Sequence, residues 1–216
     1  MLDHNRTQAA LKGLVFIFVL ILPLGLAPPS VAAETQEMAG SFIRSLADQA
    51  IKSLTQKDTP RDVKIKRFRT LFNDSFAVRS IGRFVLGRSW RKASKEEQTE
   101  YLKLFEDLMV VSYVDRFARY AGENLNVTRT RSENAKNATV FTQISRKTGK
   151  PVKVLWRVRA YGDTMKVLDV IVEGASMSQT LRSDFGSIIR QKGGKVSGLL
   201  DVLRVKTASL KAAKAN

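Results

Sequence analysis

Residues 151–173 read PVKVLWRVRAYGDTMKVLDVIVE. Every second residue from 152 to 160 is apolar and most residues between them are basic, which is the two-residue period of a strand with one buried face. The tripeptide Tyr-Gly-Asp at 161–163 predicts a tight connection to a second strand at 164–173. The stretch therefore predicts an antiparallel hairpin with one face in the core.

The same alternation extends towards the N-terminus, and the sequence on either side of it has a different period. The expected strands are 125–132, 138–147, 151–161 and 164–173. Before about residue 124 and after residue 176, apolar residues recur with helical spacing. The order helices, strands, helices indicates an α+β fold, with helices packed around one twisted antiparallel sheet of about four strands.

Helical segments are expected on both sides of the strand region. They are 36–57, a segment that begins at Thr59-Pro60, 78–86, 95–121, 176–190 and a last helix through 199–205. Capping boxes open two of them, Ser94 with Glu97 and Ser176 with Gln179. The segment 95–121 is apolar around most of its circumference, so we expect the sheet to cover one side and other helices to cover the rest.

Residues 1–33 have the layout of a secretory signal peptide. Two basic residues come first, 14–26 form an apolar run, and 31–33 are small residues of the kind found at cleavage sites. The run contains a proline and is shorter than the about 20 residues that a spanning helix needs. We expect cleavage after Ala33, a periplasmic location and one domain over 34–216, with an uncleaved membrane anchor as the alternative.

Composition excludes several kinds of chemistry. The chain has no cysteine and a single histidine, His4, which lies in the leader. The exported part therefore lacks disulfides, thiolate or imidazole metal sites, and the Ser-His-Asp and Cys-His nucleophile systems. We expect no cofactor and no bound metal.

The charge of the chain is strongly positive. Lys and Arg number 37 against 20 Asp and Glu, a net charge of +17. Loss of the leader removes Arg6, Lys12 and Asp3, which leaves 35 basic and 19 acidic residues, or +16. Such a charge suggests nucleic acid for a cytoplasmic protein, but an exported protein meets anionic lipid and acidic proteins instead. We therefore expect no nucleic acid partner; a cytoplasmic location would revive that alternative.

No catalytic constellation is recognised. Gly193-Gly194-Lys195 resembles part of a phosphate-binding loop, but it lacks the spacing and follows a helix, so we interpret it as a helix stop. The carboxylate pairs Glu96–Glu97 and Glu106–Asp107 are adjacent on a helix and do not face each other. We expect no enzyme; one that uses a lone buried carboxylate on a cup-shaped fold is kept as an alternative.

The apolar residues of the sheet and of helix 95–121 have two interpretations. They form an ordinary filled core, as in a scaffold protein, or they line an apolar cavity between sheet and helices. Export without catalytic residues favours a ligand that is itself apolar. An acyl chain gains about 0.8 kcal/mol for each buried CH₂ group, so a lipid can be held without covalent chemistry.

Two blocks of sequence carry a resemblance. The first is IGRFVLGRSWR at 81–91, which continues into 94–120, and the second is VLDVIVEGAS at 167–176, which continues to RSDF at 182–185. Together they resemble the MlaC family of periplasmic phospholipid-binding proteins, also described under toluene tolerance. The similarity extends over nearly all of residues 40–206.

The resemblance implies a deep cavity for acyl tails between helices and a twisted antiparallel sheet. It implies a carrier that moves phospholipid between an outer-membrane lipoprotein–porin complex and an inner-membrane ABC transporter with an MCE-domain protein, and so maintains outer-membrane lipid asymmetry. We expect a monomer. This chain has Met165 where many relatives have an aromatic residue, and Leu181 where they have tyrosine. We expect both differences to alter the shape of the pocket. A carrier of hopanoid or another polycyclic lipid is the runner-up.

Strand alternation and helical phase select the residues expected to line the cavity. They are Phe84, Leu86, Trp90, Leu104, Phe105, Leu108, Met109, Tyr113, Val154, Trp156, Val158, Val170 and Val172. Head-group or docking contacts are expected from Arg83, Arg88 and Arg182.

Overall fold

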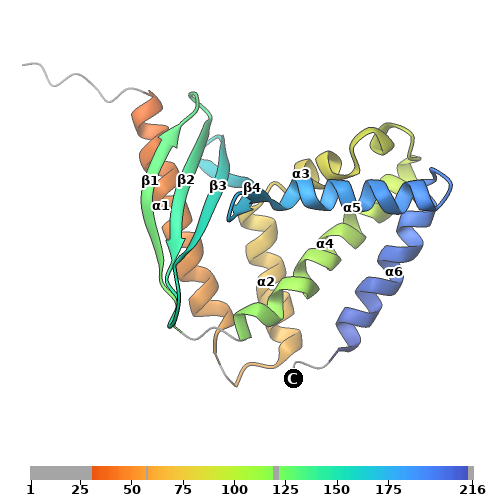
Figure 1. The fold of residues 1–216 in the computed structure, drawn as a ribbon, viewed down its shortest axis with the longest axis horizontal. Helices are drawn as coiled ribbons and strands as arrows, with labels where there is room; N and C mark the ends of the chain where they lie inside the picture. Colours follow the sequence, from red (N-terminus) through yellow and green to blue (C-terminus); the bar gives the residue numbers. More distant parts are fainter. Residues whose placement is uncertain (1–30, 57, 119–121, 214–216) are drawn as a thin grey trace, which may run out of the picture.

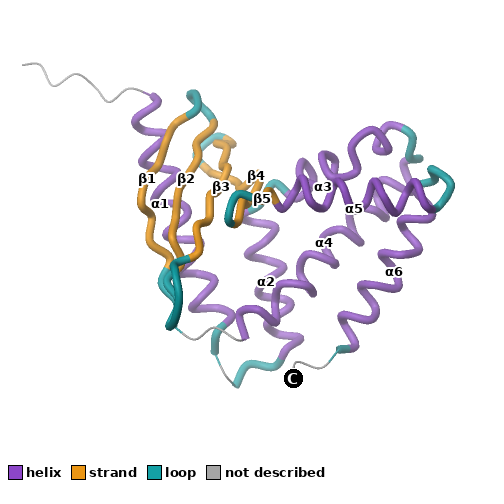
Figure 2. Tube along the Cα trace, viewed as in Figure 1, coloured by secondary structure: helices purple, strands orange, loops and turns teal. Residues whose placement is uncertain are grey.

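The computed structural model describes residues 31–56, 58–118 and 122–213, in which helices lie on one side of a single sheet (Figures 1 and 2). The helices are α1 (Val31–Leu54), α2 (Arg61–Ser75), α3 (Val78–Leu86), α4 (Lys95–Ala118), α5 (Met177–Gln191) and α6 (Val196–Ala212), with a 3-10 turn, η1, at Gly87–Arg91. The strands are β1 (Leu125–Ser132), β2 (Asn137–Ile144), β3 (Val152–Tyr161), β4 (Thr164–Val172) and β5 (Ala175–Ser176).

The sheet is an antiparallel meander in the order β1-β2-β3-β4-β5. The predicted α+β class, with about four strands in one sheet, is confirmed. The two residues of β5 were not predicted because so short a strand shows no alternation. A register shift between Arg157 and Val158 interrupts the pairing of β3 with β4.

Helix α1 runs along the sheet and packs against β1 and β2 (Figure 1). Val140 and Trp156 are paired across β2 and β3, so they lie on the same face. Val140 belongs to one buried cluster with Ile43 and Leu46 of α1. At the far end of the helix, Thr35 Oγ1 donates a hydrogen bond of 2.9 Å to the carbonyl of Ala135 in the β1–β2 turn.

The remaining helices form the other side of the molecule. Helix α4 packs against α6 and α2, and α3 packs against α5. Tyr101 of α4 is fully buried at their centre, and its hydroxyl donates to the carbonyl of Gly82 at 3.0 Å. The rings of Phe105 and Phe185 pack against it at 5.9 and 6.3 Å.

Local signals explain most of the element boundaries. The backbone N–H of Ser94 donates to Glu97 Oε2 at 2.9 Å, and the N–H of Glu97 donates back to Ser94 Oγ at 3.2 Å, which confirms the capping box. Helix α3 ends at Gly87, whose φ of 59° suits glycine, and a Cβ there would lie 3.0 Å from the Arg182 guanidinium. Helix α2 begins next to the predicted Thr59-Pro60, with Pro60 at the N-cap and no side-chain cap.

The sheet does not cover α4 directly, contrary to expectation. The side of α4 that carries Phe105, Met109 and Tyr113 instead faces a cavity whose opposite wall is the sheet. The predicted signal peptide lies outside the described residues except for 31–33, which form the start of α1. Cleavage after Ala33 stays a prediction. Within the part of the chain that is described, no helix is both long and apolar enough to span a membrane.

Candidate lipid-binding cavity

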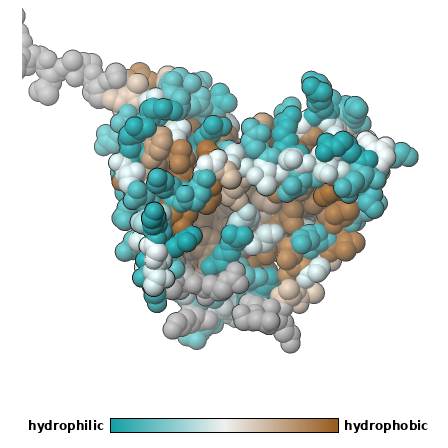
Figure 3. Space-filling model, in the orientation of Figure 1, coloured by the Kyte–Doolittle hydropathy of each residue, from teal (hydrophilic) through white to brown (hydrophobic). Residues whose placement is uncertain are grey.

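A cavity of about 490 Å³ lies between the sheet and the helices. Apolar residues gather in the hollow between these two halves, as Figure 3 shows. Of the described residues that line it, all but Arg116, Glu123, Asp169 and Ser178 are apolar or aromatic. A space with this lining suits a ligand that is largely hydrocarbon.

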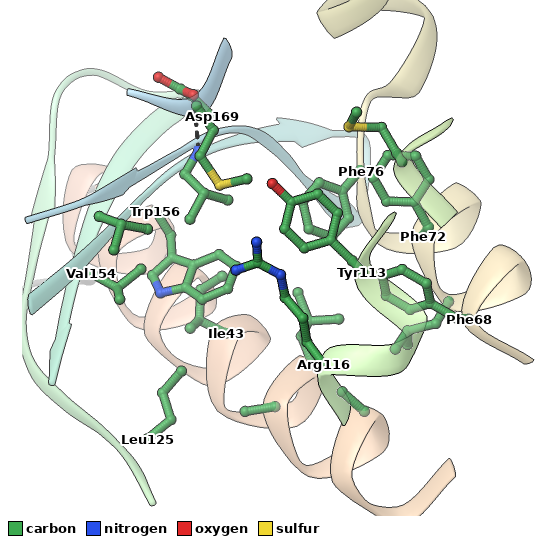
Figure 4. Close-up of a pocket in the computed structure, with 18 of the residues that line it drawn as sticks. Ile43, Phe68, Phe72, Phe76, Tyr113, Arg116, Leu125, Val154, Trp156 and Asp169 are labelled. Carbon is green, nitrogen blue, oxygen red and sulfur yellow. Dashed lines mark hydrogen bonds between the residues drawn. The ribbon is translucent and has the colours of Figure 1, made fainter. Parts of the chain in front are cut away.

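One wall is the sheet, because alternate residues of neighbouring strands point to the same face. It is formed by Leu125, Ile144, Val154, Trp156, Val170 and Val172. The indole Nε1 of Trp156 donates to Thr142 Oγ1 at 3.0 Å, and this hydroxyl donates to the carbonyl of Val154 at 2.9 Å. Because the indole N–H is satisfied within the sheet, the ring faces the cavity as an apolar surface (Figure 4).

A second wall is a stripe on α4. Phe105, Met109, Tyr113 and Phe117 recur every fourth residue and all line the cavity. The Phe117 ring packs at 5.4 Å from that of Phe68 on α2. The aromatic wall then continues along α2 to Phe72 and Phe76, whose rings lie 4.8 Å apart.

Helix α1 closes the cavity with a face that contains small residues. This wall is formed by Ile43, Leu46, Ala47, Ala50 and Ile51. The two alanines take up little of the space opposite the sheet. The remaining apolar lining includes Ile81 of α3 with Met177 and Leu181 of α5.

The polar lining residues have different environments. Asp169 is buried, and its carboxylate accepts hydrogen bonds from the Ser176 hydroxyl at 2.6 Å and from the backbone N–H groups of Val170 and Ser178 at 3.0 and 3.1 Å. These contacts hold the start of α5 against β4. Its oxygens are therefore engaged in structure, which makes Asp169 a poor candidate for a general base.

Tyr113 and Arg116 are neighbours on α4. The Arg116 guanidinium lies 4.8 Å from the centre of the Tyr113 ring. Burial raises the pKa of Tyr113, although Arg116 acts to lower it, so the hydroxyl stays protonated at neutral pH. Among the described residues, no group of three or more carboxylates or histidines is placed to hold a metal ion.

Seven of the thirteen residues expected to line the cavity do so. They are Phe105, Met109, Tyr113, Val154, Trp156, Val170 and Val172. On β3 and β4 the alternation identified them, and on α4 the helical phase did. Whether they contact a lipid stays a prediction.

The other six lie elsewhere. Leu104 and Leu108 are rotated by about 100° from the cavity stripe of α4, and Val158 is paired with Ala138 in the filled core. Leu86 and Trp90 are buried in the core cluster outside the lining. Phe84 is 42% exposed and lies beneath the Arg182 guanidinium, 4.9 Å from its ring centre.

The three arginines expected near a head group also lie outside the cavity lining. Arg83 stacks on the Trp90 ring at 5.4 Å, and Arg182 donates to the carbonyl of Phe84 at 2.7 Å. Arg88 is exposed on η1. All three are on the α3–α5 side of the molecule, where they remain candidates for docking.

The cavity walls formed by α1 and α2, and the arginine at position 116, were not predicted from the sequence. Both helices showed apolar stripes, but helical periodicity does not distinguish a core face from a cavity face. The one available signal was the pair Ala47 and Ala50 within the stripe of α1, since small residues there leave space opposite the sheet. Arg116 carried no signal, because basic residues are frequent at helix C-termini.

Comparison with known families bears directly on the resemblance noted in the sequence. The family model described as MlaC protein matches residues 44–205. The chain belongs to the MlaC family. This confirms the resemblance of the blocks at 81–91 and 167–176, and the matched range includes almost all of the cavity lining.

Two relatives of this MlaC-family chain illustrate the range of similarity. The toluene tolerance protein ttg2D of Pseudomonas putida is 22% identical over 126 residues, which are 58% of this chain and 59% of that protein. A phospholipid-binding protein from Ralstonia solanacearum, solved in complex with a phospholipid, superimposes with a TM-score of 0.72 at 20% identity. The match covers 80% of this chain and 98% of that structure, and it shows a shared fold.

Proposed function

We propose that the protein is a periplasmic carrier of glycerophospholipid that holds the acyl tails in the cavity between sheet and helices. The observation that carries this proposal is the cavity of about 490 Å³ with an apolar lining at all but four positions. The phospholipid complex of the Ralstonia solanacearum relative supports it.

The lining supplies the driving force for lipid uptake. Each CH₂ group moved from water into the cavity contributes about 0.8 kcal/mol, so an acyl chain is bound tightly without any covalent step. The seven lining residues identified from the sequence, together with α1 and α2, are proposed to contact the tails. Specificity among glycerophospholipids then follows tail volume more than head-group identity.

The wider role rests on family membership and charge. The carrier is proposed to be the soluble component of an Mla-type system, exchanging lipid with an inner-membrane ABC transporter that contains an MCE-domain protein and with an outer-membrane lipoprotein–porin complex. The net charge of +16 that remains after loss of the leader, from 35 basic and 19 acidic residues, favours approach to anionic membranes and acidic partner surfaces. Arg83, Arg88 and Arg182 are proposed to contribute to such docking.

A polycyclic lipid such as a hopanoid is the second candidate. The observation that favours it is the position of Leu181, which lines the cavity where the family resemblance leads us to expect a tyrosine. A smaller, apolar side chain there alters the shape of the space beside α5.

Native mass spectrometry of the purified mature protein tests both candidates. We expect a bound mass that matches a diacyl glycerophospholipid, and extraction followed by fragmentation gives its identity. A bound hopanoid would replace the phospholipid proposal. A protein that stays free of lipid after incubation with phospholipid vesicles would contradict the carrier function altogether.

A further inference from the structure

Arg116 is the only cation among the described residues that line the cavity. It lies in the last turn of α4, one turn beyond Tyr113, where the apolar stripe of that helix ends. Its side chain is exposed, and Figure 4 shows the guanidinium reaching between the rings of Trp156 and Tyr113. The cavity therefore has apolar walls and a cation at one edge.

The contacts of Arg116 differ from those of neighbouring arginines. Arg61 forms a bidentate pair with Asp115, both contacts at 2.9 Å, and Arg69 contacts Glu106 and Asp107 at 2.6 Å each. Within the described residues, no carboxylate forms an ion pair with Arg116, whose recorded contact is the Tyr113 ring. Asp115, the adjacent carboxylate, is already used by Arg61.

The helix dipole explains why a basic residue occurs in the last turn of α4. It does not explain the direction in which the Arg116 side chain points. The Arg116 side chain projects over the cavity, with its guanidinium against the ring of Tyr113 (Figure 4). A guanidinium offers a planar fork of N–H donors that matches two oxygens of a phosphate group, and the phenol adds an O–H donor.

The lining also contains two carboxylates, Asp169 and Glu123. Asp169 is held by Ser176 and Ser178, and Figure 4 shows it on the opposite side of the cavity from Arg116. Glu123, just before β1, also lines the cavity, so the edge that carries Arg116 is mixed in charge.

We propose that Arg116, assisted by the Tyr113 hydroxyl, binds the phosphate of a lipid head group whose tails occupy the cavity. This inference rests on the proposed carrier function and specifies the class of cargo. The protein should select lipids with a phosphate ester over uncharged lipids of identical tails. Head-group selection is thus assigned to α4 and not to Arg83, Arg88 or Arg182.

A competition between two lipids with the same acyl chains tests the proposal. Lipid-free mature protein is incubated with mixed vesicles of phosphatidylglycerol and diacylglycerol, and the bound ratio is read by native mass spectrometry. We expect the wild type to favour phosphatidylglycerol by about tenfold, equivalent to about 1.4 kcal/mol. In Arg116→Gln the ratio should approach the vesicle composition while the total lipid bound stays near the wild-type amount.

Matched variants distinguish the effect of the phosphate subsite on lipid preference from the effect of overall charge. Arg159→Gln removes the same charge from an exposed position on β3 outside the cavity and should keep the wild-type ratio. Tyr113→Phe should reduce the preference in part, and Arg116→Lys should retain part of it because lysine lacks the bidentate fork. An equal loss in Arg159→Gln and Arg116→Gln would overturn the subsite in favour of a general electrostatic effect.

The remaining outcomes distinguish this inference from the carrier function. Wild-type protein that binds both lipids without preference, or Arg116→Gln with an unchanged preference, would overturn the phosphate subsite and leave the carrier intact. Wild-type protein that binds neither lipid would contradict both proposals. Inorganic phosphate alone should not saturate the lipid-free protein; Arg116-dependent saturation with no lipid preference would indicate a site for free phosphate instead.

Discussion

Ala47 lies half-buried on α1 and lines the cavity. Whether there is empty space in front of its methyl group distinguishes a hollow interior from a filled one. In a packed core, a larger side chain forces neighbours out of their rotamers and typically costs about 1–3 kcal/mol. In a cavity, the same side chain enters space that the ligand would use.

We therefore predict that Ala47→Phe folds with nearly wild-type stability and retains much less phospholipid. Thermal unfolding of the lipid-free protein and native mass spectrometry after vesicle incubation check the two parts. Ala208→Phe on the exposed face of α6 is the matched control and should retain lipid normally. Loss of stability by more than about 1 kcal/mol in Ala47→Phe alone would indicate that this part of the interior is filled.

The difference between Leu108 and Met109 shows where prediction from sequence ends at this scale. Both are apolar, buried and adjacent on α4, but only Met109 lines the cavity. The sequence identifies the apolar surface of a helix that is apolar nearly all round. It does not indicate which part of that surface faces a neighbouring helix and which faces the cavity, because this depends on how α4 is rotated against α2 and α6.

At the scale of elements, ion pairs connect α4 to its neighbours α2 and α6. Asp107 of α4 accepts hydrogen bonds from Arg69 of α2 at 2.6 Å and from Lys211 of α6 at 2.8 Å. Burial alone would raise the pKa of Asp107, but the hydrogen bonds from Lys211 and Arg69 outweigh it and hold this pKa below its usual value. The carboxylate thus links three helices that frame the cavity.

This depressed pKa makes the contribution of Asp107 dependent on pH. It is fully present above the unfolded carboxyl pKa of about 3.9 and is lost as the pH falls through the lower pKa of the folded state. We predict that Asp107→Asn lowers the free energy of unfolding by about 1–2 kcal/mol at pH 7. The difference from wild type should shrink below about pH 4.

Urea unfolding at several pH values measures this effect. Asp201→Asn is the control, since Asp201 is 70% exposed and its pair with Arg204 on α6 is solvated, so little change is expected at any pH. An Asp107→Asn deficit of the same size at pH 3 and pH 7 would contradict the assigned role.

The capping box of α4 gives a second prediction at this scale. Ser94→Ala removes the hydroxyl that accepts from the Glu97 N–H and should cost about 1 kcal/mol of stability. The retained lipid should be unchanged, because neither residue lines the cavity. Chemical unfolding and lipid quantification on the same preparation check both statements, and a loss of lipid without loss of stability would contradict them.

Elements with strong local signals were predictable and those without were not. The bounds of α3 match the expected 78–86, because its end is fixed by a glycine with positive φ. Strand β3 begins one residue after the expected start and ends as expected, because apolar residues alternate from 152 to 160. The 3-10 turn η1 and the strand β5 are too short to generate a period, so neither was expected.

At the scale of the whole molecule, the cavity arises because two halves meet along a limited surface. Helix α1 and the sheet form one half, and α3 to α6 form the other, with α2 between them (Figure 1). Each half has its own buried residues, such as Val140 in the first and Tyr101 in the second. The two halves contact each other only in part, through α1 with α4 and β4 with α3 and α5, and elsewhere their apolar faces leave the space lined by Trp156 on one side and Met109 on the other.

The positions of the two tryptophans offer a direct test of what fills that space. The chain contains only Trp90 and Trp156. Trp156 lines the cavity, whereas Trp90 is buried against Arg83 and Tyr101 outside it. Each tryptophan therefore reports on a different part of the interior when the other is replaced by phenylalanine.

The decisive measurement is tryptophan fluorescence with phospholipid that carries brominated acyl chains, which quench a nearby indole. In Trp90→Phe, where only Trp156 emits, loading the brominated lipid should quench most of the emission relative to the same lipid without bromine. In Trp156→Phe, where only Trp90 emits, quenching should be weak. Strong quenching of Trp90 with an unaffected Trp156, or no quenching of either in protein shown to carry the lipid, would place the tails outside this cavity and contradict the account.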